Sequence, residues 1–374
     1  MKLFDVYPLF DVNLLKGEGC YVYDDKGTRY LDFYGGHAVI SIGHAHPHYV
    51  KKLEEQLHLL SFYSNSVRMP VQQKLADKLG QLSGCDAYNL FLCNSGAEAV
   101  ENALKVASFH NNRKKVIAFR GAFHGRTSGA VAVTDNPKIK PPVNDDSHVI
   151  FLDFNDEAWL KRAFAENEIC AVIIETIQGV NGIYEPAESF LQLIQQLCNE
   201  HNALFIADEI QCGYGRSGHF FAYQFADVQP DVITMAKGMG NGFPIAGILI
   251  HPKIAAKHSM LGTTFGGAPL ACAAGLAVLE VIEQENLIQN AVDVGNYLLE
   301  QCKLLPKVKE VRGKGLMIGI EFEFPIKQLR DILVYEHQIF VGNSNHPNTL
   351  RLLPSLTITK NEVDLLINAL KISI

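Results

Sequence analysis

The chain has 374 residues, of which 48% are hydrophobic and 20% are charged, and its formal net charge is −7. A chain of this length can bury a full core and is long for one compact unit, so we expect two domains. The acidic balance and the lack of a Lys/Arg run argue against nucleic acid as a partner.

The N-terminus interrupts its apolar residues with Asp5, Pro8 and Asp11, so it lacks the apolar stretch of a signal peptide. No later apolar run reaches about 20 residues, the length that a membrane span requires. We therefore expect a soluble, cytoplasmic protein with no membrane partner. The cysteines are scattered without a CxxC pair, which favours reduced, buried thiols over disulfides or a zinc site and predicts no metal. They are Cys20, Cys85, Cys93, Cys170, Cys198, Cys212, Cys272 and Cys302.

Short apolar segments alternate with amphipathic helical segments along most of the chain. Residues 21–33 predict two strands joined by a tight turn, in a peripheral unit. Further strands are predicted at 89–93, 115–119, 171–175, 204–208 and 231–236. A long helix from about residue 276 leads into a strand pair within 307–324. The order predicts an α/β fold: a large domain (46–275) with a mostly parallel sheet flanked by helices, and a smaller α+β domain (276–374) to which residues 1–45 contribute.

The segment NSGAEAVENALKVA (94–107) directly follows a predicted strand and opens a helix. The backbone N–H groups of Ser95, Gly96 and Ala97 would lie at the helix N-terminus, where an anion is favoured. Gly96 allows close backbone approach, and the Ser95 hydroxyl adds a donor. An ordinary helix cap explains the same residues, so this segment alone leaves phosphate binding open.

Asp208 and Glu209 follow an apolar strand in LFIADEIQCGYGRSG (204–218), at the sheet edge where α/β proteins bind ligands. A capping or ion-paired Asp is the alternative. Lys237 ends another apolar strand and precedes a glycine-rich turn, so we expect partial burial to favour its neutral, nucleophilic amine. The alternative is a lysine that extends from the strand end into solvent.

These features together match the needs of one cofactor, pyridoxal 5′-phosphate (PLP). The phosphate needs a cradle, the pyridine nitrogen needs a carboxylate that keeps it protonated, and the aldehyde carbon needs a lysine. A helix N-terminus, a strand-end aspartate and a strand-end lysine supply all three. The sequence therefore predicts a PLP site.

The sequence resembles the class III (ω-amino acid) aminotransferases of PLP fold type I, and within them the acetylornithine (or succinylornithine) aminotransferases. The resemblance extends over essentially the whole chain. The motifs that carry it, in order, are YGGHAVISIGHAHP (34–47), NSGAEAVENALKVA, FRGAFHGRTSGA (119–130), AVIIETIQG (171–179), LFIADEIQCGYGRSG, ITMAKGMGNGFPIAG (233–247), TTFGGAPLACAAG (263–275) and LRLLPSL (350–356).

The resemblance implies a role for each matching residue. Lys237 would bond covalently to the cofactor and Asp208 would bind the ring nitrogen, so both are catalytic. The other cofactor-binding residues would hold the phosphate (Ser95, Gly96 and Ala97), stack on the two ring faces (Phe123 and Ile210), bind the phenolic oxygen (Gln211), and reach the phosphate of a neighbouring subunit in a homodimer (Thr264). Core packing for Phe123 and a turn hydroxyl for Thr264 remain the alternatives from the residues alone.

The resemblance also implies substrate-binding residues. Arg126 would hold the carboxylate of an acylated ornithine, and Arg351 the α-carboxylate of 2-oxoglutarate, since a guanidinium binds a carboxylate through two parallel hydrogen bonds. Thr263 and residues 34–45 would line the substrate channel. A structural ion pair is the alternative for either arginine.

The chain departs from the commoner family pattern at four positions. Val180 stands where many relatives carry a glutamate that masks the second arginine, and a valine cannot form that gate over Arg351. Ala97 replaces a commoner threonine, Thr176 a commoner proline and Ala268 a commoner asparagine.

The expected reaction is transfer of the δ-amino group of an N2-acyl-ornithine (acetyl or succinyl) to 2-oxoglutarate, in arginine biosynthesis. Its products are an N-acyl-glutamate 5-semialdehyde and glutamate. His37 and Lys140 are candidates for a cation that would select succinyl. Alternatives are an ω-aminotransferase for ornithine, 4-aminobutyrate, lysine or a diamine, or a non-catalytic PLP-fold binding protein.

Overall fold

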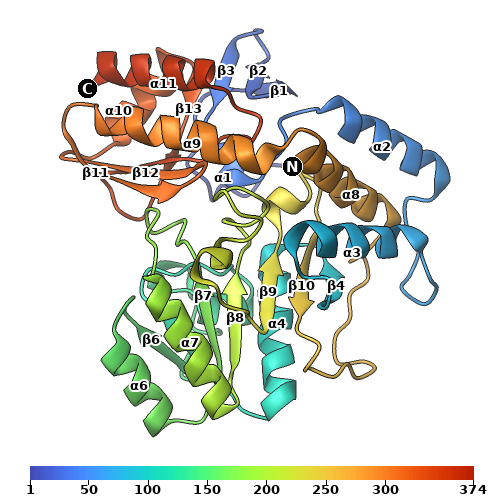
Figure 1. The fold of residues 1–374 in the computed structure, drawn as a ribbon. Coiled ribbons are helices and arrows are strands. Elements are labelled where there is room, and N and C mark those ends of the chain that lie inside the picture. The colour runs from blue at the N-terminus through green and yellow to red at the C-terminus, as the bar shows by residue number, and fades with distance from the viewer.

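The computed structural model describes residues 1–374, and its elements form two bodies (Figure 1). One body contains a seven-stranded sheet with helices on both faces. The other contains two four-stranded sheets with the last three helices of the chain. No helix of the protein combines the length and the apolar character that crossing a membrane would need.

The large sheet has the order β4-β10-β9-β8-β7-β5-β6. Its strands β9, β8, β7, β5 and β6 run parallel, whereas β10 is antiparallel to both β4 and β9. The mostly parallel sheet predicted from the sequence is therefore confirmed. The strands are β4 (Asn89–Cys93), β5 (Lys115–Phe119), β6 (Val149–Leu152), β7 (Ile169–Glu175), β8 (Leu204–Asp208), β9 (Val232–Met235) and β10 (Ala246–Ile250).

Strands β7 and β8 are buried along their whole length, as expected of a parallel sheet covered on both faces. Alternate residues face opposite sides, because side chains alternate along a strand. Ile173 and Ile206 pack with helix α4, while Ile174 and Ala207 belong to the core that includes helix α7. The near-continuous apolar sequence of these strands follows from this double burial.

The helices that flank the large sheet are α4 (Gly96–Asn111), α5 (Ser128–Ala132), α6 (Glu157–Glu166) and α7 (Glu188–His201). Helices α2 (Pro47–Leu59) and α3 (Pro70–Ser83) both pack against α8 (Pro269–Gln284). The expected long helix is present, but it begins at Pro269, before residue 276, and ends at Gln284, where α9 (Leu287–Lys303) takes over. The remaining helices are α10 (Lys327–Tyr335) and α11 (Lys360–Ser373).

Two small sheets form the second body. The first has the order β1-β2-β3-β13, in which β13 (Ile339–Phe340) pairs in parallel with β3 (Arg29–Asp32) and joins the two ends of the chain. The predicted hairpin is formed by β2 (Tyr21–Asp24) and β3, after β1 (Leu14–Glu18). The second sheet contains the predicted strand pair β11 (Val308–Lys314) and β12 (Met317–Phe322), with β15 (Thr349–Leu352) and β14 (Gly342–Asn343).

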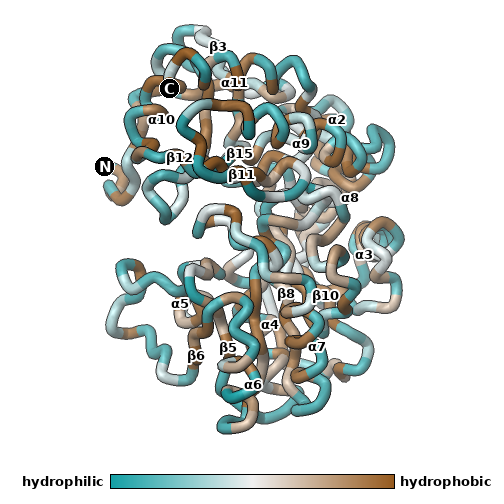
Figure 2. The backbone as a smooth tube through the Cα atoms, turned by 60° about the vertical axis from the view of Figure 1, so that its left-hand side comes forward, coloured by the Kyte–Doolittle hydropathy of each residue, from teal (hydrophilic) through white to brown (hydrophobic).

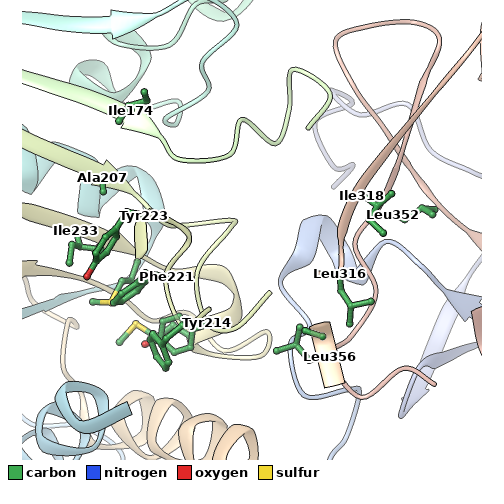
Figure 3. Close-up of a cluster of buried hydrophobic side chains, with 14 of the residues drawn as sticks. Ile174, Ala207, Tyr214, Phe221, Tyr223, Ile233, Leu316, Ile318, Leu352 and Leu356 are labelled. Atoms are coloured by element: carbon green, nitrogen blue, oxygen red, sulfur yellow. The ribbon is translucent and has the colours of Figure 1, made fainter. Parts of the chain in front are cut away.

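One cluster of buried hydrophobic side chains extends through both bodies. Figure 2 shows that hydrophobic residues concentrate along strands such as β5 and β6, while the connecting segments are mostly hydrophilic. Figure 3 shows part of the cluster, with Ile174, Ala207 and Ile233 on strands of the large sheet. Across from them lie Ile318 and Leu352, on β12 and β15 of the second small sheet. All eight cysteines are buried, as the sequence led us to expect.

A left-handed turn follows β3. Gly35, Gly36, His37 and Ala38 (α1) all have positive φ, from 55° to 69°. The Asp32 carboxylate holds the start of the turn by accepting from the backbone N–H groups of Tyr34 and Gly35 at 3.0 and 2.8 Å. Non-glycine residues adopt this conformation at a cost, so the turn depends on the contacts that surround it.

Candidate active site

A cavity of about 420 Å³ lies at the carboxyl ends of the large-sheet strands. Its walls come from the segments that follow β4, β5, β8 and β9, and from Glu175 at the end of β7. This is the edge at which open α/β sheets bind ligands. Of the predicted site residues, those that line the cavity are Ser95, Gly96, Ala97, Phe123, Arg126, Asp208, Ile210, Gln211 and Lys237.

Asp208 ends β8 with its carboxylate only 3% exposed. One carboxylate oxygen, Oδ1, accepts from the backbone N–H of Ile210 and from the Thr234 hydroxyl, each at 3.1 Å. The other, Oδ2, lies 2.6 Å from Nδ1 of His124, which is itself buried. These donors stabilise a negative charge inside the protein, where an unpaired carboxylate would be costly.

Sequence reasoning missed His124, although it lies inside the FHGRT motif between Phe123 and Arg126. The imidazole donates from Nδ1 to Asp208, while its Nε2 is buried without a hydrogen-bond partner. Its backbone N–H donates to the Thr134 hydroxyl at 2.9 Å, which holds the ring against Asp208. A histidine adjacent to the expected ring-stacking aromatic was the available signal.

Lys237 follows β9 and adopts a positive φ of 40°. Burial lowers the pKa of its ammonium group, an effect that the nearby carboxylates of Asp208 and Glu175 partly oppose. The neutral amine is therefore populated at lower pH than in a free lysine, and it can attack an aldehyde. This is the electrostatic environment that the sequence led us to expect.

Helix α4 begins at Gly96, with Ser95 as its N-cap. The Ser95 hydroxyl oxygen accepts from the backbone N–H of Glu98 at 3.2 Å, so the capping interpretation holds. The first backbone N–H groups of the helix have no intrahelical acceptor and remain available to an anion. A Cβ at Gly125 would lie 2.8 Å from that of Ala97, so glycine keeps this end of the cavity open.

Glu175 is a second buried carboxylate that sequence reasoning missed. It accepts from the backbone N–H groups of Phe123 at 2.8 Å and of Gly179 at 3.0 Å. Burial raises its pKa, and the neighbouring Asp208 charge acts in the same direction. Glu175 thus fixes the segment that follows β5 and the segment that follows β7.

The predicted substrate arginines occupy different environments. Arg126 is exposed and lines the cavity. Arg351, on β15, is 3% exposed and does not line the cavity, but its Nη1 lies 3.4 Å from Oε1 of the cavity residue Gln211. No carboxylate of the chain forms an ion pair with Arg351, so its guanidinium is free to receive one.

The two threonines lie outside the cavity. The Thr263 hydroxyl accepts from the Asn94 side chain at 3.2 Å and from the Gly266 N–H at 3.1 Å, next to a cavity-lining residue. Thr264 is exposed to solvent in the single chain. Of segment 34–45, only Val39 lines the cavity.

The surroundings of the two candidate succinyl-binding cations argue against that role. Lys140 pairs with Asp146 at 2.5 Å and does not line the cavity. Partial burial and the Arg351 and Lys237 cations lower the pKa of His37 to about 4, so its imidazole is neutral at pH 7. No group of three or more His, Cys, Asp or Glu side chains is arranged to hold a metal ion.

One of the departures from the commoner pattern, Thr176, has a local explanation, whereas the structure offers none for Ala268. Thr176 donates its hydroxyl at 2.6 Å to the buried Glu209 carboxylate, which a proline could not do. Glu209 also accepts from the backbone N–H groups of Ala222 and Tyr223, so it holds the segment after β8 and lies outside the cavity. Ala268 caps α8 without a side-chain hydrogen bond, and Pro269 begins that helix.

The residues of the cavity fit PLP. The buried carboxylate of Asp208 lines the cavity and is oriented by His124. Lys237, whose pKa is lowered, lines it too, and the N-terminus of helix α4 lies at the cavity wall. These are the groups that a pyridine nitrogen, an aldehyde and a phosphate require. Fold and site together define a transaminase of PLP fold type I.

The aminotransferase class-III family profile matches residues 5–374, and the chain belongs to this family of PLP-dependent enzymes. The chain is similar to the acetylornithine aminotransferases of Archaeoglobus fulgidus, with 42% identity over 97% of this chain and 95% of that protein, and of Bacillus subtilis, with 40% identity over 99% and 97%. A solved structure of the ornithine aminotransferase from Toxoplasma gondii ME49 superposes with a TM-score of 0.92 at 28% identity, covering 99% of this chain and 92% of that one.

Proposed function

We propose that this chain transfers the δ-amino group of an N2-acyl-ornithine, acetyl or succinyl, to 2-oxoglutarate, with the acyl-glutamate semialdehyde and glutamate as products. The observation that carries the proposal is the full-length similarity, near 40% identity, to proteins named acetylornithine aminotransferase. Two arginines support it, Arg126 at the cavity and the buried Arg351 beside the cavity residue Gln211, because both substrates carry carboxylates that a guanidinium can bind. The reaction would serve arginine biosynthesis.

When bound, PLP supplies an aldehyde carbon that accepts an amino group and a protonated ring that withdraws electrons. Asp208, oriented by His124, would hold the proton at the ring nitrogen. The Lys237 amine would hold the cofactor through its aldehyde carbon and, when free, would take a proton from the δ-carbon of the donor. Its lowered pKa suits both tasks, because each requires the neutral amine.

The remaining cofactor contacts are proposed from the same geometry. Ser95, Gly96 and Ala97 would bind the phosphate at the α4 N-terminus, and Gln211 would donate to the phenolic oxygen. Phe123 and Ile210 would cover the two faces of the ring. The cavity position of all six residues supports this assignment.

Arg126 would bind the carboxylate of the acylated ornithine, and Arg351 the α-carboxylate of 2-oxoglutarate and glutamate. The exposure of Arg126 at the cavity and the lack of an ion pair on Arg351 support these roles. Thr263 would line the approach to the cavity.

We also propose a division of the chain into residues 1–45, 46–275 and 276–374. The β3–β13 pairing favours it, because it places the first and last of these segments in one body, although the second boundary falls inside α8.

A homodimer is part of the proposal, with Thr264 of each chain reaching the phosphate bound by the other. Thr264 is exposed, and beside it Phe265 is 63% exposed and forms a ring pair with Phe62, itself 41% exposed. Exposed aromatic residues of this kind typically mark interfaces. Light scattering should give twice the mass of one chain, and Phe265→Asp should shift the measured mass toward that of the monomer.

We propose a cytoplasmic location for the protein.

A half-reaction assay tests the function. Purified, PLP-loaded protein is mixed separately with N2-acetylornithine, N2-succinylornithine, ornithine and 4-aminobutyrate, and the loss of the cofactor's visible absorbance band is followed. Rapid conversion by one acylated ornithine is the expected outcome and would also give the acyl preference. Conversion by ornithine or 4-aminobutyrate alone would replace the substrate assignment, and no conversion by any amine would refute a transaminase role.

A further inference from the structure

Arg351 is a buried cation whose protein contacts are all uncharged. Its Nε donates to the backbone carbonyl of Asn343 at 2.5 Å, and its Nη1 faces the Gln211 side chain. Burial lowers its pKa, although an arginine in a protein stays protonated at neutral pH. A buried guanidinium is commonly paired with a carboxylate, and no carboxylate of this chain forms an ion pair with Arg351.

The Gln211 amide occupies the position next to that guanidinium. Its Oε1 lies 3.4 Å from Nη1, a long hydrogen bond, and its Nε2 donates to the His37 carbonyl at 3.2 Å. Gly179 lies directly against Oε1, and a Cβ at that residue would collide with it. The amide is therefore held between the left-handed turn, Gly179 and Arg351.

No carboxylate from the neighbouring segments competes for the arginine. Val180 follows Gly179 with an apolar side chain, and its carbonyl accepts from the Asn345 N–H at 2.8 Å. Glu175 is the acid closest to Val180 in the preceding sequence, and backbone N–H groups of Phe123 and Gly179 occupy it. A substrate carboxylate would therefore have to displace only the long hydrogen bond from Arg351 to the uncharged Gln211 amide.

We propose that Gln211 is the resident partner of Arg351 and keeps this arginine open to a substrate carboxylate in both half-reactions. The inference rests on the proposed function. A long hydrogen bond from the guanidinium to an uncharged amide oxygen is readily exchanged for a shorter one to a carboxylate, whereas a carboxylate of the chain in the same place would compete with the substrate. Because Nε2 has a second N–H, the same amide can also donate toward the cofactor cavity.

The test compares Gln211→Glu, which supplies a competing carboxylate of the same shape, with Gln211→Met, which removes the acceptor. Single-turnover half-reactions are measured separately for the acylated ornithine, whose carboxylate is assigned to Arg126, and for 2-oxoglutarate. Gln211→Glu should weaken apparent 2-oxoglutarate binding by about tenfold to hundredfold, the range of a charged hydrogen bond, and change donor binding less than threefold. Gln211→Met should leave 2-oxoglutarate binding unchanged or tighter.

Maximal rates are expected to fall in both variants, because the amide also faces the cofactor, so the difference between the two substrates is the readout. Equal weakening of both substrates, or an equal effect of Glu and Met, would overturn the inference. In an Arg351→Gln background the Gln211→Glu penalty on 2-oxoglutarate should vanish, and its persistence would also count against the inference. Failure of the unmodified protein in either half-reaction would instead refute the proposed function.

Discussion

Glu175 and Asp208 are direct neighbours across β7 and β8, and each is the last residue of its strand. Both carboxylates are buried at the base of the same cavity, yet their hydrogen-bond partners differ. Two backbone N–H groups donate to Glu175, whereas a histidine, a threonine hydroxyl and one backbone N–H group donate to Asp208. The first carboxylate organises the backbone, and the second can serve the chemistry.

Neutralising these two acids should therefore have different consequences. Asp208→Asn removes the charge that holds the ring proton, and we expect kcat to fall at least about a thousandfold, since that charge is worth several kcal/mol in the transition state. Glu175→Gln, the matched control, keeps one acceptor and should mainly cost stability, about 1–3 kcal/mol for a backbone donor left unpaired. Steady-state kinetics and urea unfolding of both variants decide the matter. Near-normal turnover in Asp208→Asn would contradict the assignment.

His124 should act through Asp208. In His124→Phe an aromatic ring is kept and the Nδ1 donor is lost, so we expect kcat to drop roughly tenfold to hundredfold, the worth of one hydrogen bond to a charged group. The KM values should change little, because His124 makes no proposed contact with substrate. The absorbance of the bound cofactor should shift toward the form with an unprotonated ring. A variant with unchanged spectrum and kcat would show that the 2.6 Å contact is only structural.

The Thr176 hydroxyl should stabilise the fold. Thr176→Val keeps the shape but leaves the buried Glu209 carboxylate without one donor, which should reduce the free energy of unfolding by about 1–3 kcal/mol. Thr176→Ser retains the hydroxyl and should recover most of that loss. Chemical denaturation of the three proteins measures the difference. Equal destabilisation by Val and Ser would trace the effect to packing.

Several features could be predicted from the sequence because they depend on local patterns. The strands ending at Asp208 and just before Lys237, and the helix starting at Gly96, follow from apolar periodicity and from a capping serine. Strand-end placement then brings these residues to one cavity. The eight motifs made the family resemblance specific.

Other features depend on contacts between residues far apart in the chain, which one sequence does not reveal. The pairing of β3 with β13 joins segments near opposite ends of the chain, and the bonds of Glu175 depend on how two loops fold back. Strands β6 and β10 were not among the predicted segments, because periodicity alone does not assign so short an apolar run to a strand. The placement of Gln211 against Arg351 likewise required the fold.

The lowered pKa of Lys237 gives a prediction about stability against pH. Burial makes the folded state prefer the neutral amine, whereas the unfolded chain protonates below its ordinary pKa of 10.5. Stability is therefore lost as the pH falls from that value through the folded-state pKa, and it stays reduced at pH 7.

In the cofactor-free protein, Lys237→Met should remove this cost and raise Tm at pH 7, with a smaller gain near pH 10, while abolishing turnover. Thermal unfolding at both pH values tests this, with Lys371→Met on the protein surface as the control. A gain equal at both pH values would point to hydrophobic packing, and substantial turnover by Lys237→Met would overturn the catalytic assignment.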